Sequence, residues 1–147
     1  MKIFPSVALI VLAAALTGCA ATGPSHKEIA SKIQAVNAEQ GRVYFYRNSS
    51  MLGAALTPDI KFDGVVVGES KQGGFFYVDT KPGSHEAITS TEVANKLSFV
   101  VAKGETKYVR TKVSMGLLAG HVIPELVNAD EAMKEVSELS YTGNLAK

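Results

Sequence analysis

The sequence predicts a mainly β protein: a small antiparallel β-sandwich of about seven strands, with an amphipathic helix before it and a short helix after it. Short runs rich in β-branched and aromatic residues recur between turn signals, spaced every ~8–12 residues as in a sandwich. Helical spacing of apolar residues occurs only near the two ends of the chain. Residues 41–147 are close in number to the ~100 of a small sandwich.

The N-terminus has the parts of a secretory signal. Lys2 precedes an uncharged run over residues 3–16, and small residues follow it in Leu16-Thr17-Gly18-Cys19. The run is too short to span a bilayer, which takes roughly 20 apolar residues. We therefore expect residues 1–18 to be a signal peptide; the alternative is that Cys19 is a buried structural cysteine in an N-terminal helix.

The Leu-Thr-Gly-Cys string resembles the lipobox of bacterial lipoproteins. The resemblance implies that the chain is cut before Cys19, that the Cys19 thiol is lipidated and that the new amine is acylated. Ala20, rather than aspartate, follows the cysteine. By similarity to Gram-negative sorting rules, this implies an outer-membrane lipoprotein that faces the periplasm.

Charge and cysteine content limit the possible partners. The chain has 15 Lys+Arg and 14 Asp+Glu, and Lys2 is the only charge within residues 1–18, so the remainder is balanced. A balanced domain lacks the basic surface expected for nucleic acid and the polybasic stretch expected for anionic lipid. A single cysteine used by lipid leaves none for a disulfide, so the fold depends on its core.

The predicted elements begin with a flexible tether over residues 20–25. Ser25 and Glu28 match a capping box, and a helix is expected over 27–40 because Ile29, Ile33 and Val36 follow at helical spacing. Residues 19–40 are thus predicted to form a lipidated tether and a separable helix.

Strands are predicted over the rest of the chain, separated by turn sequences. Asp63-Gly64 supplies a tight hairpin, and Pro124 confines the last strand to an edge or a bulge. The expected strands cover 43–47, 60–62, 65–67, 75–78, 86–92, 97–102, 108–113 and 122–127. The predicted core consists of Val43, Phe45, Phe62, Val65, Val67, Phe76, Val78, Leu97, Phe99, Val109 and Val113.

The end of the chain is predicted to turn helical. Asn128 places a capping side chain three residues before Glu131, and Met133, Val136 and Leu139 form a weak apolar stripe. Residues 140–147 are expected to be a frayed tail.

Several short strings, most of them turns, occur within residues 41–139. They are Tyr46-Arg47, Phe62-Asp63-Gly64 with Gly68, Pro82-Gly83-Ser84-His85, and Lys103-Gly104-Glu105 before Tyr108-Val109-Arg110. Together they resemble a family of bacterial lipoproteins, domain-of-unknown-function family 2846. The resemblance implies a small transthyretin-like or carboxypeptidase-regulatory-like sandwich. Because the matching strings are mostly turns, they specify fold more than chemistry, and the family supplies no site residues to transfer.

No catalytic, metal or cofactor site is predicted. His26, His85 and His121 lie in three separate contexts without a Gly-x-Ser-x-Gly nucleophile elbow. Arg47 and Arg110 lie on strands and could meet a carboxylate or a sugar, although such arginines are more often solvated.

The segment 115–120 is an uncharged apolar stretch between two strands, where loops are usually polar. The favoured interpretation is that Leu117 and Leu118 fold back to cap the core. The alternative is a hydrophobic contact with a partner or with lipid headgroups.

The sequence therefore predicts a non-enzymatic, lipid-anchored module of the cell envelope that binds an envelope protein or a glycan, or is structural. One alternative is an envelope hydrolase that uses His85 or His121. Another is an accessory subunit of a secretion or stress assembly, docked through the N-terminal helix.

Overall fold

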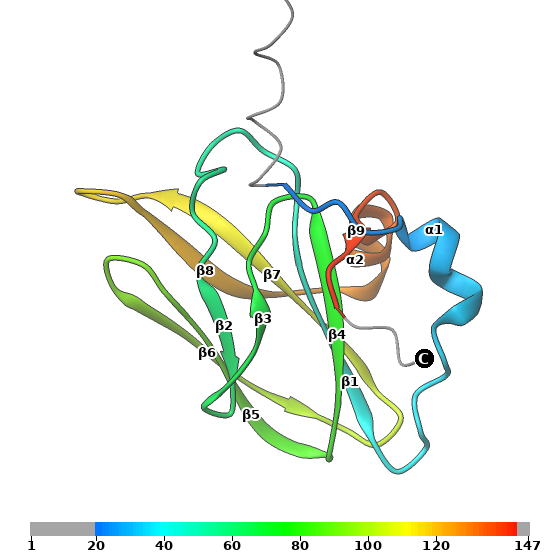
Figure 1. Ribbon diagram of the computed structural model, residues 1–147. Helices are drawn as coiled ribbons and strands as arrows, with labels where there is room; N and C mark the ends of the chain where they lie inside the picture. Colours follow the sequence, from blue (N-terminus) through cyan, green and yellow to red (C-terminus); the bar gives the residue numbers. More distant parts are fainter. Residues whose placement is uncertain (1–19, 144–147) are drawn as a thin grey trace, which may run out of the picture.

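The computed structural model describes residues 20–143, which form two packed β-sheets with short helices beside them (Figure 1). One sheet has five strands in the order β8-β7-β1-β4-β9, and the other has four in the order β3-β2-β5-β6. The predicted mainly β sandwich is confirmed. In chain order the elements are α1 (His26–Ile29), the 3₁₀ turn η1 (Ala30–Lys32), β1 (Gly41–Arg47), β2 (Asp59–Phe62), β3 (Val65–Glu69), β4 (Gly74–Thr80), β5 (Gly83–Ser90), β6 (Ala94–Val101), β7 (Thr106–Met115), β8 (Gly120–Val127), α2 (Ala129–Val136) and β9 (Ser140–Tyr141).

The sandwich is not wholly antiparallel, which corrects one detail of the prediction. β1 pairs with β7 in parallel, and β4 pairs with β9 in parallel. Strands of the four-stranded sheet lie between β1 and β7 in the chain, so β7 returns beside β1 in the same direction. β9 falls in the predicted frayed tail, yet it adds a strand to the sheet and buries Tyr141.

Strand β1 is buried on both faces. On the inner face, the ring of Phe45 lies 5.6 Å from that of Phe62 in the opposite sheet. On the outer face, Tyr44 stacks on Tyr108, and Tyr46 reaches α2. The outer face is covered because the N-terminal segment and α2 gather beside the five-stranded sheet (Figure 1).

The N-terminal helix is much shorter than predicted, with regular helix and 3₁₀ turn ending at Lys32 and Ile33 already extended. The predicted capping box is present, since the Glu28 carboxylate accepts from the Ser25 N–H at 2.6 Å. Ile29 is 1 % exposed within the core cluster. A short isolated helix is only marginally stable in water. Burial of the Ile29 side chain therefore stabilises this segment more than a longer helix would.

The prediction of a flexible tether and a separable helix is wrong for the described part of this segment. The Ala21 N–H donates to the Gln72 carbonyl at 3.1 Å, the Tyr141 N–H donates to the Pro24 carbonyl at 2.8 Å, and the His26 N–H donates to Leu139. Backbone hydrogen bonds therefore hold the chain against the sandwich from its first described residues.

Most of the predicted core is confirmed. Val65 is the clear exception, with 64 % of its surface exposed. It lies beside the Asp63-Gly64 turn on β3, the edge strand of its sheet. Pro124 lies on β8, which is an edge strand as expected. Buried as predicted are Val43, Phe45, Phe62, Phe76, Phe99 and Val109, while Val67, Val78, Leu97 and Val113 are half-buried.

Candidate functional site

One end of the sandwich gathers three uncharged segments. β1 ends there at Arg47, paired with Gly74 at the start of β4. Because β7 runs parallel to β1, the β7–β8 turn lies at the same end. Ala20 is brought there by its bridge to Gln72. We call this surface the apolar end and define it as residues 20–25, 48–58 and 113–120, none of which is Asp, Glu, Lys or Arg.

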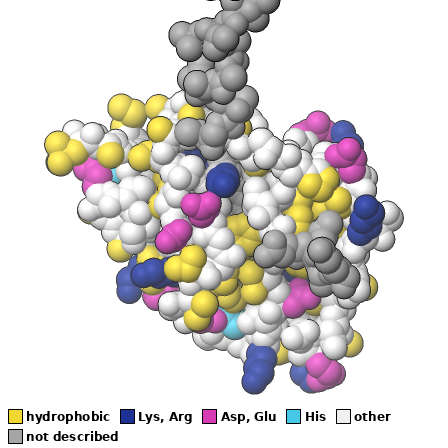
Figure 2. Space-filling view, in the orientation of Figure 1, with side chains coloured by type: hydrophobic (Ala, Val, Ile, Leu, Met, Phe, Trp, Pro, Cys, Tyr) yellow, Lys and Arg dark blue, Asp and Glu magenta, His cyan; other side chains and the backbone are white. Residues whose placement is uncertain are grey.

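Large apolar side chains project from the tips of the apolar end. In the β7–β8 turn, Leu117 and Leu118 are 97 % and 95 % exposed, and Met115 is also exposed. In the 48–58 loop, Met51 is 87 % exposed and Leu52 is 52 % exposed. Figure 2 shows hydrophobic side chains gathered along this end of the molecule.

The favoured prediction that Leu117 and Leu118 cap the core is therefore wrong. The last β1–β7 pair is Tyr46 with Arg110, but the β7–β8 hairpin continues to Met115. The turn thus extends beyond the strand that carries the core residues. The alternative prediction, a hydrophobic contact surface, agrees with this exposure.

The 48–58 and 113–120 segments of the apolar end touch each other, and Gln72 links residues 20–25 to them. A Cβ atom on Gly53, which has a φ of +66°, would lie 2.7 Å from the Val113 side chain. A Cβ atom on Gly120 would lie 2.8 Å from Leu56. The Ser50 N–H donates to Gln72, the residue that also binds the N-terminal segment. The apolar end is therefore one connected surface.

Arg47 holds the 48–58 loop from the inside. Its guanidinium donates to the carbonyls of Gly53 at 2.6 Å, of Ser70 at 3.1 Å and of Leu56. Arg47 is only 2 % exposed, and burial lowers its pKa. Among residues 20–143 its partners are neutral carbonyls rather than carboxylates. The buried charge is satisfied by hydrogen bonds that fix the loop.

Glu92 holds the β7–β8 turn in a similar way. Its carboxylate accepts from the amides of Ala119 at 2.8 Å and Leu118 at 3.2 Å. Hydrogen bonds from these amides, against the opposing effect of burial, lower the pKa of Glu92. The backbone amides of the turn therefore bind Glu92, and the side chains of Leu117 and Leu118 face solvent.

Two hollows flank the 48–58 loop. One has a volume of about 240 Å³ and lies against β7, where its lining includes Leu52 and Val113. The other has a volume of about 410 Å³ and lies towards the β7–β8 turn, where its lining includes Leu56 and Ala119. The apolar end is thus grooved on both sides of this loop.

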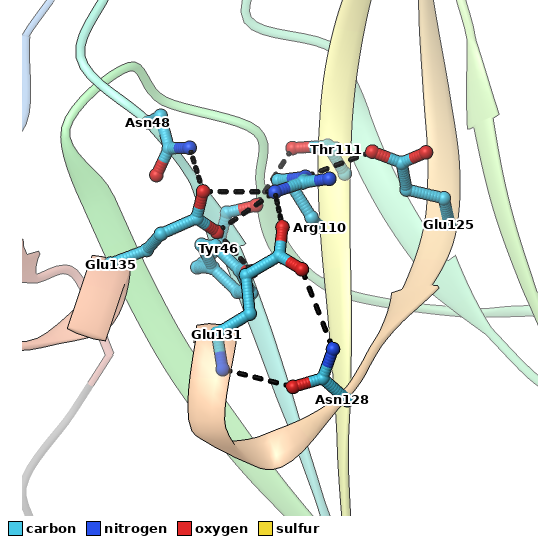
Figure 3. A network of polar contacts seen from close by, with 8 residues as sticks. All are labelled: Tyr46, Asn48, Arg110, Thr111, Glu125, Asn128, Glu131 and Glu135. Carbon is cyan, nitrogen blue, oxygen red and sulfur yellow. Dashed lines mark hydrogen bonds and ion pairs between the residues drawn. The ribbon is translucent and has the colours of Figure 1, made fainter. Parts of the chain in front are cut away.

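A polar network centred on Arg110 lies on the outer face of the five-stranded sheet (Figure 3). Arg110 donates to Glu125, Glu131 and Glu135, each at 2.8 Å. The Tyr46 hydroxyl donates to Glu135 at 2.5 Å. Burial acts to raise the pKa of Glu135, but hydrogen bonds from Tyr46, Asn48 and Arg110 lower it overall.

The Arg110 network fastens α2 to the sheet. The predicted cap of this helix is confirmed, because the Glu131 N–H donates to the Asn128 side chain at 3.0 Å. The network itself was not predicted. Glu131 and Glu135 are four residues apart and so share one face of α2, which in the structure is the face that meets Arg110. Arg110 meets carboxylates of this chain rather than solvent, which was the more common arrangement expected for an arginine on a strand.

The histidines of the hydrolase alternative lie at opposite ends of the sandwich. His85 stacks on Phe62, and its ring nitrogens lie 2.7 Å from the Asp63 carboxylate and 2.8 Å from the Lys81 carbonyl. Burial alone would raise the pKa of Asp63, but hydrogen bonds from His85 and the Glu86 amide lower it overall. His121 lies 3.9 Å from Glu92. Neither ring has a serine, threonine or cysteine among its described polar partners.

Residues 37–122 match a family described as "Protein of unknown function (DUF2846)". The chain belongs to the DUF2846 family. It is also similar to a protein of Haemophilus influenzae (strain ATCC 51907 / DSM 11121 / KW20 / Rd) with the name "Uncharacterized protein". The two are 31 % identical over 144 residues, which cover 95 % of this chain and 84 % of that protein.

The part matched by DUF2846 includes the 48–58 loop and the β7–β8 turn, but not α2. Cys19, the predicted lipidation site, lies outside the described residues. Within residues 20–143, no helix is long and apolar enough to cross a bilayer. The same residues hold no group of three or more His, Cys, Asp or Glu side chains placed to bind a metal ion.

Proposed function

We propose that this DUF2846 protein is a lipid-anchored lipoprotein of the cell envelope that acts as a non-enzymatic binding or structural module. The observation that carries the proposal is Cys19, the only cysteine, at the end of a lipobox-like string that follows an uncharged run. Two or more lipid signals anchor a protein stably, and a lipoprotein cysteine carries at least that many. In support, Ala20, the residue after Cys19, lies at the apolar end, where it bridges Gln72.

We further propose an outer-membrane location with the domain facing the periplasm. The support is Ala20, which follows the cysteine in place of aspartate. Replacing Ala20 with Asp is expected to retain the protein in the inner membrane, as measured by separating the two membranes on a density gradient. Finding the parent protein only in inner-membrane fractions would contradict the proposed location.

A non-enzymatic role is supported by the surroundings of His85 and His121. Both ring nitrogens of His85 lie within hydrogen-bond distance of groups of this chain, so neither is free to bind a substrate. We expect no turnover of esters, peptides or peptidoglycan by the purified protein. Turnover that is lost in His85→Ala or His121→Ala would favour the hydrolase alternative instead.

The lipid anchor is tested by Cys19→Ser, with the substitution Thr22→Ser at an exposed residue as the control. The parent and Thr22→Ser proteins are expected to fractionate with membranes and to have an intact mass that includes the acyl groups. Cys19→Ser is expected to lose both properties. If Cys19→Ser remains as membrane-bound as the parent and is cut at the same bond, the proposed anchor is wrong.

A further inference from the structure

Residues 20–25 belong to the apolar end, and they directly follow the proposed anchor in the sequence. Ala20 bridges Gln72, and the Ala21 N–H donates to the Gln72 carbonyl. Cys19 is the residue immediately before Ala20. Because one extended residue spans at most ~3.6 Å, acyl chains on Cys19 would emerge beside Ala20. We propose that the apolar end lies on the bilayer, with its two loop tips inserted at the boundary between headgroups and acyl chains of neutral phospholipid.

This inference rests on the proposed lipid anchor, but it adds a second membrane contact made by the folded domain. The tips that would make the contact lie in two loops far apart in sequence, Met51 with Leu52 and Met115 with Leu117 and Leu118. Large exposed apolar side chains gathered on one surface mark a site of interaction. Because the lipid anchor would emerge beside these side chains, the bilayer is the surface nearest to them.

The two ends of the sandwich differ in charge as this orientation requires. The apolar end has no Asp, Glu, Lys or Arg in any of its three segments. The turns at the opposite end include Asp63, Lys81 and Lys103. A charged side chain is costly to place in the hydrocarbon region, so the uncharged end is the one suited to face it.

Charges at the base of the apolar end limit how deeply the tips can insert. Asp59, Glu69 and Lys71 lie at or next to strand ends, and the Glu92 carboxylate lies against the β7–β8 turn, where it accepts from the Leu118 amide. Glu69 and Lys71 pair with each other at 3.3 Å, both partly exposed. These charges would remain among the headgroups while only the tips reach the acyl chains. No cluster of basic residues occurs in the apolar end, so contact should not require anionic lipid.

The backbones of the two loops are held in place by hydrogen bonds, while the apolar side chains at their tips remain exposed. Arg47, which is buried, and Glu92, in the β5–β6 turn, bind the backbones of the two loops, so the loops are ordered before any partner arrives. Side chains on a preordered loop lose little additional freedom on contact with a surface. Both loops therefore offer apolar side chains to the membrane without first having to fold.

The absence of tryptophan from the sequence allows a direct test. Leu118→Trp places the only indole at a tip that is 95 % exposed, and Val100→Trp places it at the opposite end on a side chain that is 61 % exposed. Each full-length variant is purified in lipidated form and reconstituted into phosphatidylcholine vesicles with brominated acyl chains, which quench indole on contact. Flotation of the vesicles and the intact mass of the protein are measured on the same samples.

We expect Leu118→Trp to lose at least half of its fluorescence in brominated vesicles and to shift its emission to shorter wavelength. Val100→Trp should retain its fluorescence. If both proteins carry lipid and float, but Leu118→Trp is not quenched more than Val100→Trp, the membrane contact is wrong while the anchor stands, and an envelope protein or a second copy becomes the candidate occupant. If neither protein carries lipid or floats, the anchor is wrong and the membrane contact falls with it.

Discussion

The burial of Ile29 makes a quantitative prediction about the N-terminal segment. In a separable helix this side chain would contribute little to the stability of the sandwich, but in the structure it is 1 % exposed within the core. Replacing a buried Ile by Ala removes its transfer free energy and leaves a cavity, which together cost about 2–5 kcal/mol. Since a domain of this size has only about 5–15 kcal/mol of stability, Ile29→Ala should lower the unfolding midpoint markedly.

The assay is urea unfolding of a soluble form that starts at Ala20, followed by circular dichroism and fitted for the free energy of unfolding. Lys27→Ala is the matched control, because its ion pair with Glu138 joins side chains that are 66 % and 70 % exposed. An exposed pair of this kind is worth at most about 1 kcal/mol. A loss below about 0.5 kcal/mol for Ile29→Ala, the range of a surface site, would refute the packing of this segment onto the sandwich.

Three further predictions concern the loops and the Arg110 network. Changing both Leu117 and Leu118 to Ser should leave the free energy of unfolding within about 0.5 kcal/mol of the parent value, because neither side chain is buried. A larger loss of stability in urea unfolding would show that these side chains are buried in the core. Arg47→Met should make the 48–58 loop sensitive to limited proteolysis, since three carbonyls lose their donor; unchanged resistance would show that Arg47 does not order the loop. The lowered pKa of Glu135 means that its contribution to stability is present above its ordinary pKa of 4.5 and is lost as the pH falls through the lower pKa of the folded state; Glu135→Gln should therefore flatten the acid side of a stability–pH curve, and an unchanged curve would contradict this.

Local signals in the sequence predicted local structure well. Ser25 with Glu28 and Asn128 with Glu131 form the expected helix starts, and Asp63-Gly64 forms the expected turn with φ values of 49° and 82°. These features depend on residues at most three apart. The fold class followed from them because turns and short β-rich runs recur along the chain.

What the sequence did not predict depends on contacts between distant segments. Alternation in a strand implies one face in contact with water, so it does not predict the burial of Tyr44 and Tyr46; in the structure, segments from both ends of the chain cover that face. The exposure of Leu117 and Leu118 depends on how far β7 continues past β1. That register joins residues more than 60 apart in sequence, and no local pattern determines it.

The most direct test of the proposed orientation uses thiol accessibility in intact membranes. If Cys19 is lipidated, the chain has no free thiol, so Leu118→Cys or Lys103→Cys introduces the only site for a water-soluble thiol reagent. We predict that the parent protein is not labelled, that Lys103→Cys is labelled rapidly, and that Leu118→Cys is protected until detergent is added. Equal labelling of Leu118→Cys and Lys103→Cys in intact membranes would contradict a membrane-facing apolar end.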